Sequence, residues 1–485
     1  METLLGRISE KEELLRCYNS ERSEFVMIYG RRRIGKTFLV NKVLGQKFTF
    51  QFTGSHKAGK SRQLERFADA LKEQFKLSYT PFVDSWYHAF DALESLISQK
   101  KGKCKKVAFF DEMPWIDTPG SEFVSAFEDF WNTWAMLRDD IMCVACGSAT
   151  SWMVDNLVEN QGGLHGRITS RIYLRPFTLA ETEQYLRSHA CQWSRYTITQ
   201  CYMFIGGIPY YLSLLDPQKE LAANIDDLFF LSHAKLENEF HELYSVLFRD
   251  SERYMEIVRL LAAKREGMTR AELVEATKSN GGSLSKRLEN LERCDFILST
   301  QQFGNKRKGM IYRLSDFFTL FYLRFVDGKR RSSRPYWTTM SDSPAVAAWQ
   351  GLTFELVSMM HVDPILKKLG ISGVHTDIYS WRGIKEIAPE KGGNKPTTEK
   401  AQVDLVIERS DKYIYLCEMK FSSEEYVITK DYEQRLRSRM SLFRECTKTR
   451  KALLNTFVTT YGVKTGMHSG IVNHQVLLDD LFDNF

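Results

Sequence analysis

The sequence predicts an α/β protein whose N-terminal part is built around a parallel β-sheet. Through roughly the first 215 residues, short apolar runs alternate with helical patterns, which is typical of parallel strands joined by helices. A glycine-rich loop separates the first predicted strand from the helix that follows it. The chain has 485 residues, which corresponds to about three domains of roughly 100–200 residues each.

The composition excludes several classes of protein. Hydrophobic residues make up 43% and charged residues 26% of the chain, the balance of a folded protein with apolar cores. No apolar run approaches the ~18 residues of a membrane span, and the N-terminus reaches charged residues too soon for a signal peptide. The nine cysteines are scattered, which indicates reduced thiols. We therefore expect a cytoplasmic protein without a membrane partner. The net charge of +6 permits a nucleic-acid partner without requiring one.

The N-terminal part is predicted to contain four buried strands with helices between them. Each strand is a short apolar run, and each helix shows apolar residues at a spacing of three or four. The predicted strands are residues 25–29, 48–52, 107–110 and 141–146, and the helices include 61–75 and 121–137. Cys143 and Cys146 have the spacing of metal ligands, but they lie on an apolar strand and are expected to fill the core.

The glycine-rich loop has the pattern of a phosphate-binding loop, Gly, four residues, then Gly-Lys-Thr. Backbone N–H groups of such a loop surround phosphates at a helix N-terminus. Lys36 is expected to reach the β- and γ-phosphates of ATP and to act in catalysis, and the Thr37 hydroxyl is expected to hold Mg²⁺. The predicted nucleotide-binding residues of the loop are Gly30, Arg31, Arg32, Arg33, Ile34, Gly35, Lys36 and Thr37.

Two acids at the end of the third predicted strand complete this site. Asp111 is expected to bind the Mg²⁺, and Glu112 to orient or deprotonate the attacking water. The alternative is an acid pair that only caps a helix. The adjacent glutamate favours a hydrolytic ATPase over a protein that only binds nucleotide.

Three separated motifs resemble the archaeal and prokaryotic ATPase family of the AAA+/STAND type. They are the opening Leu-Gly-Arg-Ile-Ser-Glu at residues 5–10, the phosphate loop, and Gly-Gly-Ile-Pro-Tyr-Tyr-Leu at residues 206–212. The resemblance covers roughly residues 1–330. It implies that Gly6, Arg7 and Pro209 lie near the adenine, and that Ser148 or Thr150 senses the γ-phosphate.

Arg167 and Arg171 are candidates for an arginine that reaches the γ-phosphate. A guanidinium there neutralises charge in the transition state. The sequence leaves open whether such an arginine acts within one chain or in a homo-oligomer, and a solvated loop arginine is the alternative.

Residues 253–330 are predicted to form a winged helix-turn-helix module behind a helical linker at 216–252. Helical patterns at 254–261, 271–276 and 283–291 precede two β runs joined by a basic turn at 304–309. A capping box, Thr269 with Glu272, opens the second helix. On the third helix, Lys286, Arg287 and Asn290 are expected to point away from the leucine stripe, as in a recognition helix. DNA contact and packing against a partner are both open.

Residues 345–485 are predicted to form a third α/β domain around a hairpin. If its turn centres on Asp411, then Asp404 and Glu418 oppose each other across the two strands. Opposed carboxylates call for a cation, and a divalent metal is the predicted occupant. Lys420 shares a face with Glu418 and is expected to act on a metal-bound water.

The Asp…Glu-x-Lys pattern resembles the PD-(D/E)XK nuclease superfamily, and the surrounding segment resembles a domain that recurs behind these ATPases. This resemblance implies a restriction-endonuclease-like fold and adds Glu355 as a metal ligand; Val403 stands where the family has proline. A structural descendant without activity is the alternative. A basic helical stretch follows; it is a candidate phosphate-backbone contact, and a solvated basic face is the alternative. Its residues are Lys430, Arg435, Arg437, Arg439 and Arg444.

The sequence therefore leads to one main hypothesis and two alternatives. The main one is an ATP- and Mg²⁺-dependent ATPase with a nuclease-like C-terminal domain that acts on DNA or another nucleic acid, with Mg²⁺ or Mn²⁺ at the second site. The first alternative is an ATP-switched regulator or scaffold whose nuclease-like domain is inactive. The second is a DNA-binding transcription regulator.

Overall fold

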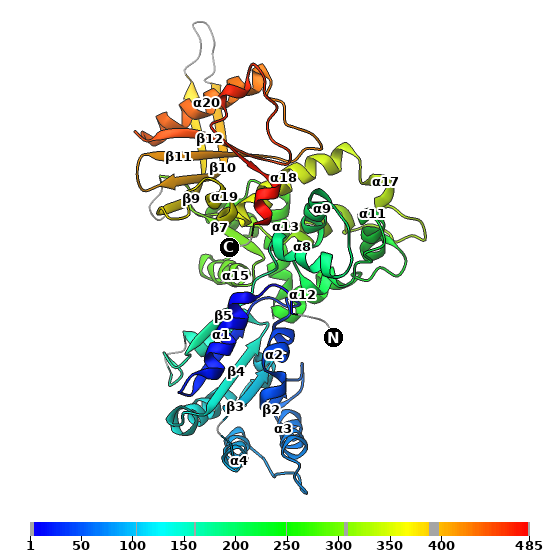
Figure 1. Cartoon of the computed structure of the whole chain (residues 1–485), viewed down its shortest axis with the longest axis vertical. Helices are drawn as coiled ribbons and strands as arrows, with labels where there is room; N and C mark the ends of the chain where they lie inside the picture. The colour runs from blue at the N-terminus through cyan, green and yellow to red at the C-terminus, as the bar shows by residue number, and fades with distance from the viewer. Residues whose placement is uncertain are drawn as a thin grey trace. The chain divides into compact units, whose positions relative to one another are not determined.

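The computed structural model describes residues 4–102, 104–159, 162–248, 250–304, 309–387 and 397–483. They divide into two compact units (Figure 1). Unit 1 comprises Met1–Pro176, Ile208–Tyr210 and Arg293–Asp295. Unit 2 comprises Phe177–Gly207, Tyr211–Glu292 and Phe296–Phe485. Residues 305–308 of the predicted basic turn lie outside the described residues. Within the described residues, no helix is both long and apolar enough to cross a membrane.

Unit 1 is built on a parallel five-stranded sheet in the order β2-β3-β4-β1-β5. The four strands expected from the sequence are confirmed, and the fifth, β5, pairs with β1 at the edge of the sheet. Strand β4 is buried along its whole length, as is usual for a strand covered on both faces. The strands are β1 (Glu24–Tyr29), β2 (Phe48–Thr53), β3 (Lys106–Asp111), β4 (Ile141–Gly147) and β5 (Ser170–Tyr173).

Helices connect these strands, and aromatic side chains fill much of the space between helix and sheet. Phe25 of β1 packs against Phe127 and Trp131, with ring centroids 5.3 and 5.2 Å apart. The predicted helix at 121–137 is not one continuous α-helix. An α-helical segment is followed by a π-helical segment and then by a short 3₁₀ segment. The helical segments are α1 (Ile8–Asn19), α2 (Lys36–Leu44), η1 (Gly45–Lys47), α3 (Lys60–Phe75), α4 (Trp86–Ser98), α5 (Met113–Ile116), α6 (Phe123–Asp129), η2 (Phe130–Trp134), η3 (Ala135–Leu137), α7 (Thr150–Met153) and η4 (Val154–Val158).

The middle part of the chain has three helices and a small antiparallel sheet in the order β6-β8-β7. The capping box of Thr269 and Glu272 opens the second helix as expected. Asn290 differs from the expectation: it is buried and donates a hydrogen bond to the Tyr254 hydroxyl at 2.8 Å, so it faces the core. The elements are α13 (Ser251–Ala263), β6 (Met268–Thr269), α14 (Arg270–Thr277), α15 (Gly281–Arg293), β7 (Ile297–Thr300) and β8 (Ile311–Leu314).

The C-terminal part contains a mixed sheet in the order β13-β12-β11-β10-β9. Its central hairpin has the register predicted from the sequence, since Leu405 pairs with Cys417 and Val406 with Leu416. Strand β12 runs parallel to β11, with the basic helix α20 between them in the chain. The elements are α18 (Pro344–Met360), α19 (Val362–Lys368), β9 (Thr376–Ile387), β10 (Thr397–Arg409), β11 (Tyr413–Lys420), α20 (Lys430–Thr447), β12 (Ala452–Thr459), η7 (Ser469–Ile471), β13 (His474–Leu477) and η8 (Leu478–Phe482).

An aromatic cluster explains why residues 177–207 belong to unit 2, although the sequence placed them with the N-terminal domain. The Phe204 ring lies 5.7 Å from Trp349 and 5.3 Å from Trp337, measured between centroids. Burial of such large rings is strongly stabilising, so it decides which unit the segment packs with, whatever its neighbours in the sequence. The remaining helical segments of unit 2 are α8 (Leu179–Ser188), α9 (Arg195–Ile205), α11 (Leu221–Ile225), η5 (Asp226–Phe230), α12 (Glu239–Leu247), α16 (Phe317–Phe321), η6 (Tyr322–Val326) and α17 (Trp337–Met340), while α10 (Pro209–Leu212) spans the boundary.

Candidate functional site

The predicted phosphate loop leads from the end of β1 into α2 of unit 1. Gly30 has φ +140°, and a Cβ there would lie 2.3 Å from the Leu174 carbonyl oxygen, so the first glycine is required for close packing. Lys36 is buried and donates to the carbonyl oxygens of Gly30 and Arg31, at 3.0 and 2.8 Å. Burial lowers the pKa of this ammonium. The Lys36 side chain therefore links two carbonyl groups of the same loop that is expected to bind the phosphates.

Thr37 and Asp111 meet in unit 1, although 74 residues separate them in the chain. The Thr37 hydroxyl donates to both carboxylate oxygens of Asp111, at 3.1 and 3.0 Å. Burial and the negative charge of Glu112 raise the pKa of Asp111 above its ordinary value. A bound cation would reverse that shift, because it favours the ionised carboxylate. The pair has the oxygen donors that Mg²⁺ prefers.

Glu112 is held beside the end of strand β4 by Ser148. Its backbone has φ +46°, an uncommon conformation for a residue other than glycine, at the turn from β3 into α5. The Ser148 hydroxyl donates to the Glu112 carboxylate at 2.9 Å, and the Ser148 N–H lies 3.3 Å from the same oxygen. Of the two predicted sensor residues, Ser148 is the one that contacts the predicted base.

The last part of the predicted N-terminal domain contacts the loop, and its first part contacts the segment after β5. The Tyr210 N–H donates to the Arg33 carbonyl at 3.4 Å, and the Arg33 guanidinium lies 4.2 Å from the Tyr210 ring centroid. Pro209 is the residue before Tyr210, so the Gly-x-Pro segment reaches the phosphate loop. Arg7 is buried and donates to the Arg175 carbonyl at 2.5 Å, next to Gly6.

The other predicted residues of unit 1 have simpler surroundings. Arg167 lies in a turn before β5, and Arg171 lies on β5; both side chains are exposed. Cys143 and Cys146 are buried in the core as expected, and burial raises the pKa of each thiol.

Asp404 of unit 2 lies at an irregularity of strand β10, where the pairing with β9 shifts between Val403 and Val406. Such bulges turn a side chain out of the regular alternation. The Asp404 carboxylate accepts hydrogen bonds from Arg313 at 3.1 Å and from Gln402 at 2.5 Å. Arg313 comes from β8, it is buried, and its charge compensates that of Asp404.

Glu418 of unit 2 is surrounded by donors. Its carboxylate lies 2.6 Å from the Lys420 ammonium and 2.5 Å from the Arg439 guanidinium, and the Tyr432 hydroxyl also donates to it. Burial acts to raise the pKa of Glu418, but Arg439 and Lys420 outweigh burial and lower it to about 2. Arg439 was expected on an exposed basic face; its side chain is only 15% exposed because this ion pair turns it inward.

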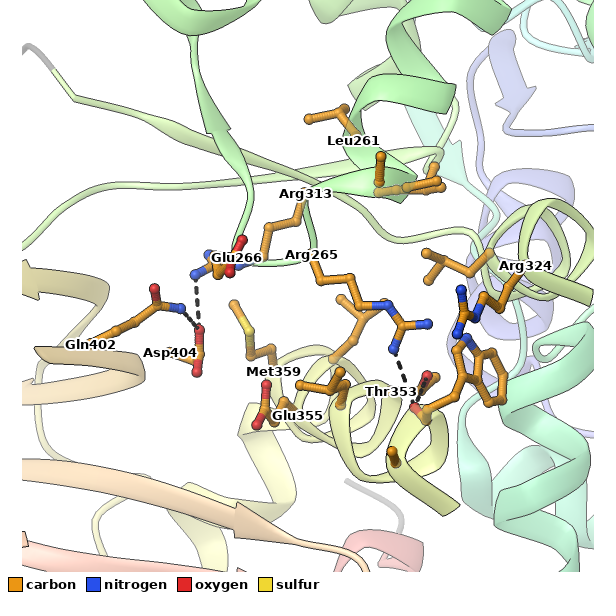
Figure 2. A pocket seen from close by; sticks show the side chains of 18 of the residues that line it. Leu261, Arg265, Glu266, Arg313, Arg324, Thr353, Glu355, Met359, Gln402 and Asp404 are labelled. Atoms are coloured by element: carbon orange, nitrogen blue, oxygen red, sulfur yellow. Dashed lines mark hydrogen bonds and ion pairs between the residues drawn. The ribbon is translucent and has the colours of Figure 1, made fainter. Parts of the chain in front are cut away.

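Glu355 of α18 completes the predicted acid set, and its carboxyl and that of Asp404 line the cavity shown in Figure 2. Burial and the negative charge of Asp404 raise the pKa of Glu355 to about 8. Within the described part of the chain, no group of three or more Asp, Glu, His or Cys side chains is arranged to hold a metal ion. Arginine and lysine partners neutralise Asp404 and Glu418, so a metal ion would have to compete with those cations for the two carboxylates.

Comparisons with known proteins show what the chain is similar to. Residues 4–215, less than half of the chain, match the family model described as an ATPase domain predominantly from Archaea. An uncharacterized protein of Methanocaldococcus jannaschii is 22% identical over 329 residues, which cover 65% of this chain and 68% of that protein.

Two solved structures are similar to the chain. The Walker-type ATPase of Pyrococcus abyssi is 18% identical with a TM-score of 0.49, over 66% of this chain and 96% of that one. The ORC2 protein of Aeropyrum pernix is 14% identical with a TM-score of 0.41, over 66% and 93%.

Several residues around these sites were not predicted from the sequence. They include Tyr210 beside the ATPase loop, Arg313 and Gln402 on Asp404, and Tyr432 on Glu418. Each comes from a segment whose local pattern indicates only a strand, a helix or a turn. Of these residues, only Gln402 could have been found from the local sequence. It lies two positions before Asp404 on a strand, and such residues share a face.

Proposed function

We propose that the ATPase domain hydrolyses ATP with Mg²⁺ held by Thr37 and Asp111 and with Glu112 as the general base. The hydrogen bonds from the Thr37 hydroxyl to both oxygens of Asp111 carry this proposal. Mg²⁺ would supply charge neutralisation on the phosphates. Lys36 binds the β- and γ-phosphates, and Glu112 accepts the proton of the attacking water.

Ser148 links the base to the end of strand β4 and acts as the γ-phosphate sensor of this proposal. Its hydroxyl bonds to Glu112 when no phosphate is bound, and a γ-phosphate oxygen competes for the same hydroxyl. The position of the base and the presence of ATP are then coupled. Arg167 and Arg171 are exposed, which is compatible with a role toward the site of a second copy of the chain.

We further propose that the C-terminal domain acts on nucleic acid, with Asp404, Glu418 and Glu355 as metal ligands and Lys420 as the group that acts on water. The register of β10 and β11 supports this, because it brings Asp404, Glu418 and Lys420 to one end of the hairpin. The middle module, as a winged helix, would add a nucleic-acid contact through Lys286 and Arg287 on α15.

A second candidate is an ATP-switched regulator or scaffold whose nuclease-like domain does not cut. The ion pairs of Arg313 with Asp404 and of Arg439 with Glu418 favour it, because a metal would compete with two buried guanidiniums.

One experiment separates the two candidates. The purified protein is incubated with plasmid and with single-stranded nucleic acids, with and without ATP and with Mg²⁺ or Mn²⁺. Metal-dependent cleavage that is lost in Lys420→Ala but retained in the exposed-surface variant Lys412→Ala supports the nuclease. ATP turnover without cleavage of any substrate would leave the regulator or scaffold as the better interpretation.

A further inference from the structure

A cavity of about 670 Å³ lies in unit 2 between the middle module, α18 and strand β10 (Figure 2). Its volume is in the range of pockets that bind small organic ligands. Asp404 and Glu355 lie toward one side of the cavity, and the guanidiniums of Arg265 and Arg324 lie away from them. Leucine and methionine side chains form much of the remaining wall. They are Leu261, Leu314, Leu320, Leu352, Leu356 and Met359.

On the arginine side of the cavity, Arg265 is attracted by the Glu355 carboxylate but does not pair with it. Arg265 donates only a long hydrogen bond, 3.4 Å, to the Trp349 carbonyl, and its guanidinium lies 5.8 Å from the Trp349 ring centroid. Among the residues that the structure describes, neither Arg265 nor Arg324 forms an ion pair. Arg313 in the same cavity differs, since Asp404 neutralises it.

Trp349 forms part of the cavity wall beneath Arg265 and is only 2% exposed. Burial, and after it the charge of Arg324, lower the pKa of Arg265 to about 10. Two guanidiniums on one side of the cavity therefore act on each other, and an anion between them would relieve that repulsion.

We propose that this cavity binds a phosphate group, with the guanidiniums of Arg265 and Arg324 as its donors. A planar guanidinium matches a phosphate through two parallel hydrogen bonds, and a second guanidinium matches its remaining charge. A phosphate fills only part of 670 Å³, so the apolar walls contact the sugar or base that carries it. The proposal deepens the proposed action on nucleic acid, but phosphate binding here does not depend on cleavage.

The phosphate has two sources, and the experiment distinguishes them. Binding is measured by calorimetry in EDTA on the full-length chain carrying Lys36→Ala, which removes the main phosphate ligand of the ATPase loop. The probes are inorganic phosphate, a short oligonucleotide with a 5′-phosphate, and the same oligonucleotide without it. Preference for the 5′-phosphorylated form assigns a terminal phosphate, and equal binding of both oligonucleotides assigns a phosphodiester.

Arg265→Gln and Arg324→Gln are each compared with Arg253→Gln, an exposed arginine of α13 whose partner is Glu256. We expect each cavity variant to weaken binding of the preferred probe tenfold or more, and Arg253→Gln to leave it within twofold. Arg324 has an exposed side chain, so its variant tests the proposal even where Arg265→Gln fails to fold. Equal affinities of the Arg324→Gln and Arg253→Gln chains would overturn the proposal. Because no metal is present, this result is independent of whether the C-terminal domain cuts.

Discussion

Replacing Arg439 by methionine tests how the fold holds Glu418 as a buried carboxylate. The Glu418 side chain is 12% exposed and that of Arg439 is 15% exposed, so solvent screens their charges weakly. The pKa of Glu418 falls from 4.5 to about 2, with burial opposing and Arg439 and Lys420 favouring the charged form. That difference corresponds to about 3 kcal/mol of stabilisation. Loss of one partner from a buried ion pair costs a similar amount, about 3–5 kcal/mol.

The dependence on pH follows from the direction of this shift. The folded-state pKa is depressed, so the stabilisation is present above the unfolded value of 4.5 and is lost as the pH falls through about 2. Arg439→Met should therefore destabilise the β11 region most at neutral pH. The difference from the wild type should shrink as the pH falls from 4.5 toward 2 and vanish below about 2, where Glu418 is protonated in the folded wild type as well.

Hydrogen exchange of the amides of β11 (Tyr413–Lys420) is the suitable assay, because it reports local opening in a chain of several domains. About 3 kcal/mol corresponds to exchange more than a hundredfold faster at pH 7. Arg437→Met is the matched control: it lies on the same helix, its side chain is 60% exposed, and solvent screens its pair with Glu433. If Arg439→Met accelerates exchange no more than Arg437→Met, the reasoning about Glu418 is wrong.

The remaining predictions concern the ATPase domain. Lys36→Ala should abolish ATP binding or turnover, whereas Glu112→Gln should bind ATP and retain it, as measured by nucleotide binding and phosphate release; equal loss of binding in both would show that the acids are misassigned. Ser148→Ala should lower turnover about tenfold or more with ATP affinity little changed, and an unchanged turnover number would remove Ser148 from the mechanism. If Arg167 or Arg171 acts on a second copy, turnover should rise with protein concentration and a Lys36→Ala chain should rescue the arginine variant on mixing. A turnover number independent of concentration, without rescue, would point to a monomeric switch.

The placement of the phosphate loop beside Asp111 could be predicted because these residues are tied to a short pattern and to sheet topology. The loop needs Gly30 and Gly35 at positive φ, and this requirement is visible as glycine in the sequence. Thr37 and Asp111 meet because both follow parallel strands, whose carboxyl ends share one edge of the sheet. The register of the hairpin formed by β10 and β11 could be predicted for a similar reason. A short turn fixes the pairing of two strands that are adjacent in the sequence.

What the sequence did not reveal depends on segments far apart in the chain. Arg313 reaches Asp404 across 91 residues, and no local pattern distinguishes it from any other strand arginine. Asn290 and Arg439 were placed on exposed faces by helical spacing, yet a buried hydroxyl partner and a buried carboxylate turn them inward. The assignment of residues 177–207 to unit 2 likewise follows from aromatic packing that spacing does not encode.

The two acidic sites also show why a pattern of carboxylates does not by itself fix a chemistry. At the predicted nucleotide site, the Thr37 and Ser148 hydroxyls donate hydrogen bonds to Asp111 and Glu112. At the C-terminal site, Arg313 and Arg439 already supply positive charge to Asp404 and Glu418. We therefore expect a divalent cation to enter the first site without displacing an arginine, whereas at the second it would compete with buried guanidiniums. On this reasoning, the cations that tertiary packing places beside the acids, and not the acids alone, determine how readily each site would bind a metal.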